Sequence, residues 1–216
     1  MSSALVICCG PSILDVSTEQ IATFPGIKIA VNWASVKKEF QYTHWFTQRG
    51  AWAIPEDQVL PDCVSVIGMH KQARKEGIPG LPEWLRKRHE MNPESLKTYG
   101  LNGKVAVGGF CTAPNQLPGY NSGFSAINLA LHMDCKKIVL LGFDCSHAVD
   151  VYNPEAVYNP EVDNRPKTSW RKWVNELAVQ QAKEYWHAEI VNGSTTSHCE
   201  FWPRITAEEA IKWALI

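Results

Sequence analysis

Two titratable residues that could serve as an acid or a base follow an apolar run in the second half of the sequence. Asp144 comes three residues after the run Lys137–Leu141, and His147 comes three residues after Asp144. A carboxylate or an imidazole in a cleft can take the proton of an acceptor hydroxyl. Asp144 is equally suited to cap a helix, anchor a loop or contact a metal, and a histidine in a solvated loop is common. We take both residues as catalytic candidates.

The turn Gly10-Pro11-Ser12 is a candidate for binding an anion, because it lies between the apolar run 5–9 and a predicted helix. Gly10 permits a tight turn, Pro11 has a fixed φ and no N–H to lose, and the Ser12 hydroxyl is within N-cap range. Unpaired N–H groups at the beginning of a helix attract phosphates and carboxylates. The turn therefore predicts a phosphate or carboxylate site.

Polar residues also follow the other predicted strands. The carboxyl ends of parallel strands meet at one edge of a sheet, where the ligands of open α/β proteins bind. We therefore predict a polar cleft that holds a nucleotide. The candidates at this edge are Asn32-Trp33, Thr47-Gln48-Arg49, the helix start Asn121-Ser122-Gly123, Gly142-Phe143-Asp144 and Asn192-Gly193-Ser194, with His198 and Cys199 as further candidates for its lining.

The elements that must position these residues alternate between strands and helices. Short runs rich in Val and Ile predict strands that are covered on both faces, over 5–9, 27–31, 44–47, 64–67, 104–107, 137–141 and 189–191. Helices are predicted over 122–133, 170–186 and 207–215. This alternation predicts a single domain over residues 1–216 of the α/β class, Rossmann-like, with three α/β/α layers and a mainly parallel sheet.

Two segments interrupt the alternation. Residues 146–168 follow a strand end and repeat Tyr-Asn-Pro at Tyr152 and Tyr158, so we expect a lid inserted into the domain. Residues 70–93 contain the basic run Arg86-Lys87-Arg88-His89. A solvated helix with loops is the simpler interpretation of this run, and a basic rim that attracts an acidic substrate is the alternative.

The composition is that of a globular protein and argues against several function classes. Of the 216 residues, 45% are apolar and 20% are charged, and the net charge of −1 does not favour nucleic acid as a partner. No apolar run approaches the length of a membrane span. Seven cysteines without a Cys-x-x-Cys pair argue against structural zinc and favour a cytoplasmic protein, with buried thiols at Cys8, Cys135 and Cys145.

The sequence resembles the sialyltransferase-like Rossmann group. The first signature is the apolar run into Gly-Pro-Ser, with Ala-Val-Asn at 30–32; the second is Asn-Ser-Gly at 121–123, a helix, and Lys-Lys-Ile-Val-Leu-Leu-Gly-Phe-Asp at 136–144. The group includes CMP-sialic-acid-dependent sialyltransferases, flagellin motility accessory factors, hydroxymethylpterin pyrophosphokinase-like proteins (domain of unknown function 115) and small phage-type members. The resemblance covers residues 4–34 and 119–152, and nothing between 50 and 110 matches.

The resemblance implies roles for individual residues. In the sialyltransferases the nucleotide binds the Gly-Pro-Ser turn and the Asn after the second strand, and Gln48 stands where the group has a donor-contacting Asn. Tyr152 has the position of the second of two lid tyrosines that bind the leaving phosphate, Ser146 replaces the first, and the lid histidine has no counterpart. The nucleotide-binding candidates are Gly10, Pro11, Ser12, Asn32, Gln48, Asn121, Ser122, Gly123, Gly142 and Tyr152.

The sequence is compatible with three functions. The leading one is a transferase, specifically a glycosyltransferase, that moves a sugar from a CMP-sugar-like donor to a small-molecule or glycan acceptor without a cofactor. The second is a hydroxymethylpterin pyrophosphokinase-like enzyme that uses ATP and Mg²⁺, held by Asp144 with Asp150 or Asp163. The third is a module that binds a nucleotide without catalysis. A homo-oligomer is compatible with each of them.

Overall fold

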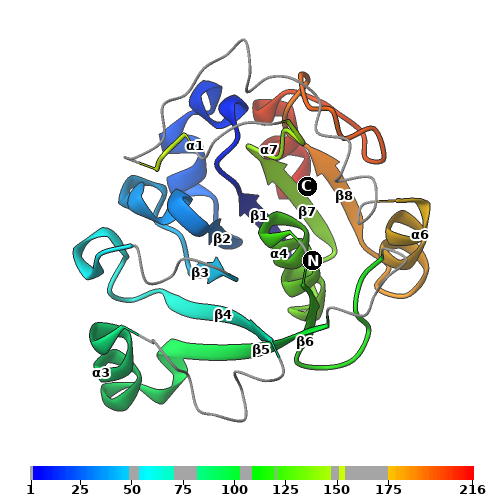
Figure 1. The fold of residues 1–216 in the computed structure, drawn as a ribbon. Coiled ribbons are helices and arrows are strands. Elements are labelled where there is room, and N and C mark those ends of the chain that lie inside the picture. Colours follow the sequence, from blue (N-terminus) through cyan, green and yellow to red (C-terminus); the bar gives the residue numbers. More distant parts are fainter. Residues whose placement is uncertain are drawn as a thin grey trace.

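A computed structural model describes residues 2–48, 54–70, 82–102, 109–119, 121–146, 151–153 and 175–216 (Figure 1). Eight strands form one sheet in the order β6-β5-β4-β3-β2-β1-β7-β8, and every neighbouring pair is parallel. This confirms the predicted α/β class and the parallel sheet. The strands are β1 (Ser3–Ile7), β2 (Ile27–Val31), β3 (His44–Thr47), β4 (Val64–His70), β5 (Leu96–Asn102), β6 (Gln116–Pro118), β7 (Lys137–Leu141) and β8 (Glu189–Asn192).

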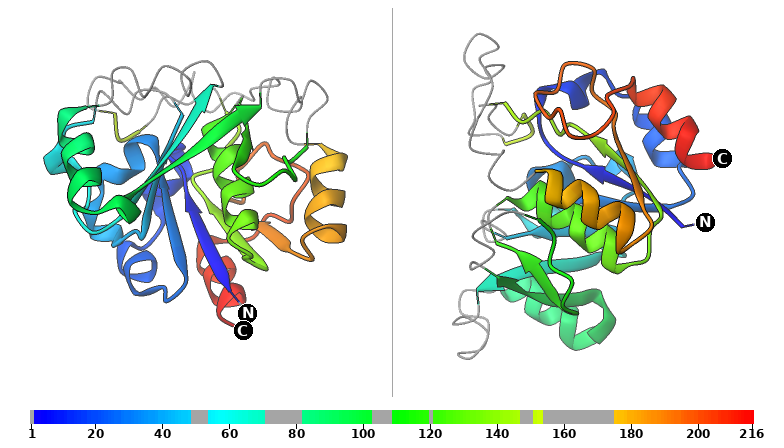
Figure 2. Two further views of the ribbon diagram at one scale, coloured as in Figure 1. Left: turned by 90° about the horizontal axis from the view of Figure 1, so that it is seen from below. Right: turned by 90° about the vertical axis from the view of Figure 1, so that its right-hand side faces the viewer.

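Helices cover both faces of the sheet (Figure 2). One face carries α4 (Ser122–His132) and α6 (Glu176–Glu184), and the other carries α1 (Thr18–Thr23), α3 (Glu83–Met91) and α7 (Ala207–Leu215). The three layers of the predicted Rossmann-like architecture are therefore present.

The side chains of β1 show why both faces need cover. Ala4 and Val6 lie in the core beneath α4, Leu5 and Ile7 lie in the core beneath α7, and all four are fully buried. Burying a large aliphatic side chain contributes about 1.5–3 kcal/mol. A strand with two apolar faces belongs in the middle of a sheet, and β1 lies between β2 and β7.

Side-chain caps fix where the helices begin. Asn121 at α4 and Asn175 at α6 each accept a hydrogen bond from the backbone N–H three residues further on. Thr206 caps α7 in a capping box with Glu209, at the position that the sequence predicts. The cap at Asn121 makes α4 begin at the sheet edge where the candidate site is expected.

The structure corrects the bounds of some predicted elements. β1 begins and ends two residues before the predicted strand 5–9, and α6 is shorter than the predicted helix 170–186. Residues 170–174 and the predicted strand 104–107 lie outside the described residues. The sequence pattern does not predict β5 or β6, because their residues mix polar and apolar types without a clear period.

The order of the strands changes direction next to β1. From β1 the chain builds β2 to β6 on one side, and it returns to add β7 and β8 on the other side. In folds of this kind the connections after the two central strands diverge, and ligands bind at their carboxyl ends. A ligand site is therefore expected at the carboxyl ends of β1 and β7.

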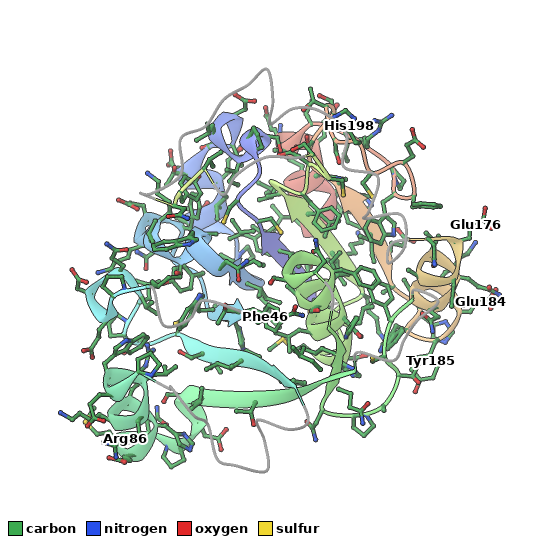
Figure 3. The ribbon with its side chains drawn as sticks, in the orientation of Figure 1. Phe46, Arg86, Glu176, Glu184, Tyr185 and His198 are labelled. Carbon is green, nitrogen blue, oxygen red and sulfur yellow. The ribbon has the colours of Figure 1, made fainter. Side chains whose placement is uncertain are left out.

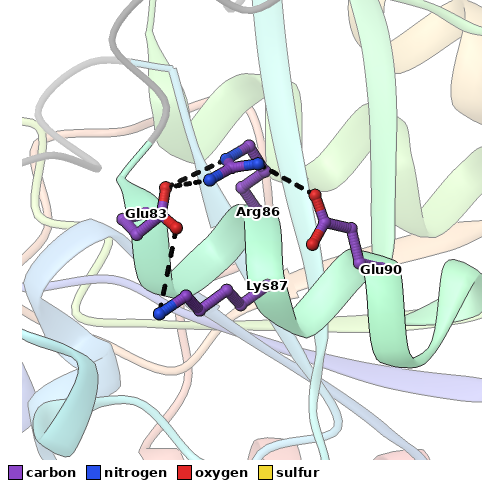
Figure 4. Close-up of polar contacts among 4 residues, drawn as sticks. All are labelled: Glu83, Arg86, Lys87 and Glu90. Atoms are coloured by element: carbon purple, nitrogen blue, oxygen red, sulfur yellow. Dashed lines mark hydrogen bonds and ion pairs between the residues drawn. The ribbon is translucent and has the colours of Figure 1, made fainter.

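The basic run at 86–89 lies on α3 and is paired largely within that helix. Arg86 contacts both Glu83 and Glu90, and Lys87 Nζ lies 3.9 Å from a Glu83 oxygen (Figure 4). These side chains are exposed, and α3 packs on the β5 side of the sheet, away from β1 and β7 (Figure 1). The contacts match the solvated-helix interpretation of the run.

None of the seven cysteines, all of which the structure describes, forms a disulfide. Cys8 and Cys135 are buried as predicted, whereas Cys145 is only partly buried. Cys8 and Cys9 lie in the cores on opposite faces of the sheet, as neighbours along an extended chain do. Across the described ranges, no helix combines the length and the apolar character that crossing a membrane requires.

Candidate functional site

Asp144 joins the loops that follow three strands. Its Oδ2 accepts a hydrogen bond from Ser12 N–H after β1, and its Oδ1 accepts one from the Ser194 hydroxyl after β8, both at 2.9 Å. The side chain itself follows β7 and is 7% exposed. Because both oxygens accept from N–H or O–H groups, the hydrogen bonds suit the ionised carboxylate. One carboxylate therefore holds the carboxyl ends of β1, β7 and β8 together.

Position 10 requires glycine because two loops approach each other closely there. Gly10 N–H donates to the Gly142 carbonyl at 3.0 Å. A Cβ at Gly10 would lie 2.6 Å from that carbonyl oxygen and closer still to Asp144 Oδ2. Gly142 has φ +65°, a left-handed conformation that glycine adopts without strain. The two predicted turn glycines therefore make the contact between the β1 and β7 loops.

The turn after β1 does not provide the backbone anion site that the sequence predicts. The segment is a short 3-10 helix, Pro11–Asp15, and Ser12 lies inside its first turn rather than at its cap. Ser12 N–H donates to Asp144, Ile13 N–H donates within the turn, and Pro11 has no N–H. The anion that this turn binds is the protein's own carboxylate.

A cavity of 530 Å³ lies beside this turn, a volume within the range of small-molecule sites. The Ser12 hydroxyl is buried and has no hydrogen-bond partner among the described residues. His198 lies in the loop after β8 (Figure 3), and its backbone N–H donates to the Asp144 carbonyl at 2.9 Å. The residues that line the cavity are Pro11, Ser12, Leu14, Asp15, Asp144, Ser146, Thr196 and His198.

Asn32 and Gln48 are held by hydrogen bonds at the ends of β2 and β3. Asn32 has φ +51°, and its Oδ1 accepts from the Thr47 hydroxyl at 3.1 Å, whereas no described residue accepts from its Nδ2. Gln48 Nε2 donates to the Pro118 carbonyl at 2.9 Å and to the Ser125 hydroxyl. Gln48 therefore connects the end of β3 to β6 and to α4, and the Asn32 side chain is held by its oxygen.

The beginning of α4 packs against the loops after β1 and β7. A Cβ at Gly123 would lie 2.8 Å from the Phe143 ring and 3.1 Å from Cys8 Sγ. Asn121 caps the helix, and the N–H groups of Ser122 and Gly123 lie in the first turn, where a helix supplies no partner of its own. The structure therefore places this predicted segment at the expected edge and gives Asn121 a structural role.

Tyr152 belongs to residues 151–153, the part of the predicted lid that the structure describes together with Ser146. Val151 N–H donates to the Cys9 carbonyl at 3.0 Å, so this segment lies at the end of β1. The Tyr152 ring meets the Phe40 ring edge-on with centroids 6.2 Å apart, and Lys37 Nζ lies 5.4 Å from its centroid. The candidates Arg49, His147, Asp150, Tyr158 and Asp163 lie outside the described residues.

The sequence pattern does not reveal the roles of Asn192 and Ser197, which fix the loop after β8. Asn192 is fully buried, and its Nδ2 donates to the Phe143 carbonyl at 3.1 Å and to the Ser197 hydroxyl at 2.9 Å. The predicted lining candidate Cys199 is fully buried and does not line the cavity. A hydrogen bond with Cys199 and burial raise the pKa of the Cys145 thiol. The only sequence signal for the roles of Asn192 and Ser197 is the run Gly-Ser-Thr-Thr-Ser at 193–197, and runs of this kind also occur in ordinary turns.

In the described part of the chain, no group of three His, Cys, Asp or Glu side chains could hold a metal ion. The magnesium alternative also needs Asp150 or Asp163, which are not described. Magnesium therefore stays a prediction of that alternative.

No protein-family model and no curated protein matches the sequence. Among solved structures, the fold is similar to the MAf glycosyltransferase from Magnetospirillum magneticum AMB-1, with a TM-score of 0.58, 13% identity, and coverage of 96% of this chain and 34% of that chain. This chain thus spans about a third of that protein. A second similar structure is the sialyltransferase CstII from Campylobacter jejuni in complex with cytidine-5'-monophosphate, with a TM-score of 0.48, 13% identity and coverage of 94% and 85%. The likeness to the first structure confirms the Rossmann-like fold that the sequence resemblance implies.

Proposed function

We propose that this chain is a glycosyltransferase that takes its sugar from a nucleotide-sugar donor of the CMP-sugar type. The observation that carries the proposal is the cavity at the ends of β1, β7 and β8, where the buried Ser12 hydroxyl has no partner among the described residues. A buried polar atom of this kind is normally satisfied by protein, water or ligand, so the Ser12 hydroxyl is available to a ligand that enters the cavity. The fold likeness to a protein described as a glycosyltransferase gives independent support.

The proposed position of the donor follows from the groups that the protein leaves for it. The base and ribose face the half-buried Asn32 amide and the Tyr152 ring at the ends of β1 and β2. The phosphate lies toward the Ser12 hydroxyl and the first turn of α4, where Ser122 and Gly123 carry N–H groups without helical partners. This position keeps the sugar at the switch point of the sheet.

The proposed reaction is a direct transfer to an acceptor hydroxyl. The hydroxyl oxygen forms a bond to the anomeric carbon, the bond from that carbon to the donor phosphate oxygen breaks, and the electron pair leaves with the nucleotide. His147 and Asp144 are the candidates for taking the hydroxyl proton. Both oxygens of Asp144 already accept hydrogen bonds, which favours His147 as the base and Asp144 as a positioning residue.

A panel of CMP, UMP, GMP, ADP and ATP, each with and without Mg²⁺, tests the proposal by thermal shift and then by turnover of the matching sugar donor. We expect CMP to raise Tm in excess chelator, and the transfer of sugar to continue there. Ser12→Ala should weaken CMP binding, whereas His89→Gln on the distant α3 is the matched control. Consumption of ATP that requires Mg²⁺ would establish the pyrophosphokinase alternative instead. Binding without turnover of any donor would establish the non-catalytic module.

A further inference from the structure

The carboxylates among the described residues that line the cavity make it unsuited to a phosphate unless a positive charge is also present. Among the described residues that line the cavity, the titratable side chains are Asp15, Asp144 and His198, and none is Lys or Arg. Asp144 accepts two hydrogen bonds in the manner of an ionised carboxylate. Two carboxylates repel a phosphate that enters the same small cavity. A cation is therefore needed, and His198 is the described lining side chain that can become one.

In the loop after β8, His198 lies between two buried residues and faces the side of the loop that lines the cavity. Ser197 and Cys199 are both fully buried, whereas His198 between them is partly exposed and lines the cavity. The Ser197 hydroxyl donates to the Phe143 carbonyl at 2.7 Å, and His198 N–H donates to the Asp144 carbonyl at 2.9 Å. These bonds fix the backbone on both sides of the imidazole.

Arg204 is a cation that contacts the same loop but not the cavity. Arg204 donates from Nη1 to the Ser197 carbonyl at 2.6 Å and does not line the cavity. Ser12 lines the same cavity as His198, and its buried hydroxyl has no partner among the described residues. A hydroxyl and an imidazolium that face one cavity can both donate to phosphate oxygens.

We propose that protonated His198, together with the Ser12 hydroxyl, binds the phosphate of the nucleotide donor. The imidazolium of His198 then supplies the positive charge that the turn after β1 does not supply. The assignment rests on the proposed function, because it takes a nucleotide phosphate as the ligand. It makes His198 a residue that distinguishes a nucleotide from its nucleoside.

Calorimetric titration with CMP and with cytidine tests this assignment on the full chain. Wild-type protein should bind CMP more tightly than cytidine. His198→Gln should weaken CMP binding by about 10-fold to 100-fold, the range for loss of a hydrogen bond to a charged group, and leave cytidine binding unchanged. His198→Lys keeps a positive charge and should keep the preference for CMP. His89→Gln on α3 is the control and should bind as the wild type does.

The outcomes separate the assignment from the proposed function. Wild-type protein that binds neither CMP nor cytidine refutes the proposed function, and the assignment falls with it. Wild-type protein that binds CMP while His198→Gln binds it equally well overturns only the assignment. CMP binding that requires Mg²⁺ and ignores His198→Gln also overturns it, because the metal then carries the charge. Equal loss of CMP and cytidine in His198→Gln overturns it as well, since it indicates a structural defect.

Discussion

Replacing Asp144 tests whether one carboxylate holds three strand ends together. In Asp144→Ala, Ser12 N–H and the Ser194 hydroxyl both lose their acceptor. Each hydrogen bond to a charged group is worth about 1.5–3 kcal/mol. The Ser194 hydroxyl can turn toward another acceptor, whereas the N–H of Ser12 is fixed by the backbone. We therefore expect a loss of about 3–5 kcal/mol in the free energy of unfolding.

Asp144→Asn should cost less, because an amide can point its oxygen at Ser12 N–H and its NH₂ at the Ser194 oxygen. Both hydrogen bonds can remain, but their acceptor is no longer charged. We therefore expect the free energy of unfolding to fall by about 1–2 kcal/mol. A change of 1 kcal/mol moves Tm by about 2–4 °C in a chain of this size. The alanine variant should therefore melt about 10 °C below the wild type and the asparagine variant about 4 °C below it.

Urea unfolding followed by circular dichroism measures both variants, with Asp15→Ala as the matched control. Asp15 lines the same cavity but is exposed, and substitution of an exposed side chain changes stability by about 0.5 kcal/mol at most. The ranking expected is Asp144→Ala, then Asp144→Asn, then Asp15→Ala as the least affected. If Asp144→Ala unfolds at the same urea concentration as Asp15→Ala, the carboxylate does not carry the contact and the reasoning is wrong.

Three further changes should have measurable effects. Gly10→Ala should lower the free energy of unfolding by about 3 kcal/mol in urea, because its Cβ would meet the Gly142 carbonyl and Asp144 in a packed site. The pKa of His44 is lowered to about 4, mainly by burial and in smaller part by the charge of Lys97. Between pH 4 and 6.5 the unfolded chain therefore binds more protons at this residue than the folded chain does. Stability should therefore fall by about 2 kcal/mol between pH 7 and pH 5, and His44→Gln should remove that part of the pH dependence in parallel urea titrations. Thr206→Ala removes the cap of α7 and should cost about 1 kcal/mol by the same assay.

The strands of the sheet centre are predictable from sequence because burial on both faces leaves an unbroken apolar run. β2, β3 and β7 have the predicted bounds, and β1 differs only by two residues. β5 reads Leu-Lys-Thr-Tyr-Gly-Leu-Asn and pairs on its outer side only with the three-residue β6. A strand near the edge is less completely buried, so polar residues are tolerated and the pattern that identifies strands is lost.

The position of the candidate site is predictable for the same reason, but its hydrogen bonds are not. Parallel strands bring the residues after them to one edge, so Gly10, Ser12 and Asp144 could be placed together from the sequence. Which donor meets which acceptor depends on a contact between residues 132 positions apart. Gln48 likewise looks like a ligand-binding amide in the sequence, and it donates to Pro118 and Ser125 instead. Such pairings depend on the exact approach of two loops, which no local pattern encodes.

The contact between Asp144 and Ser12 changes how this edge of the sheet must attract an anion. A turn whose N–H groups face solvent binds phosphate through backbone dipoles, which have the same strength at every pH. Here the carboxylate of Asp144 takes the fixed N–H of that turn, which stabilises the junction of three strands but places a negative charge where the phosphate is expected. Any compensating charge must come from a side chain or an ion, and the described side chain in position to supply it is His198. Stability and anion binding therefore compete for the same turn, and under the proposed function the phosphate depends on donors outside the backbone of that turn.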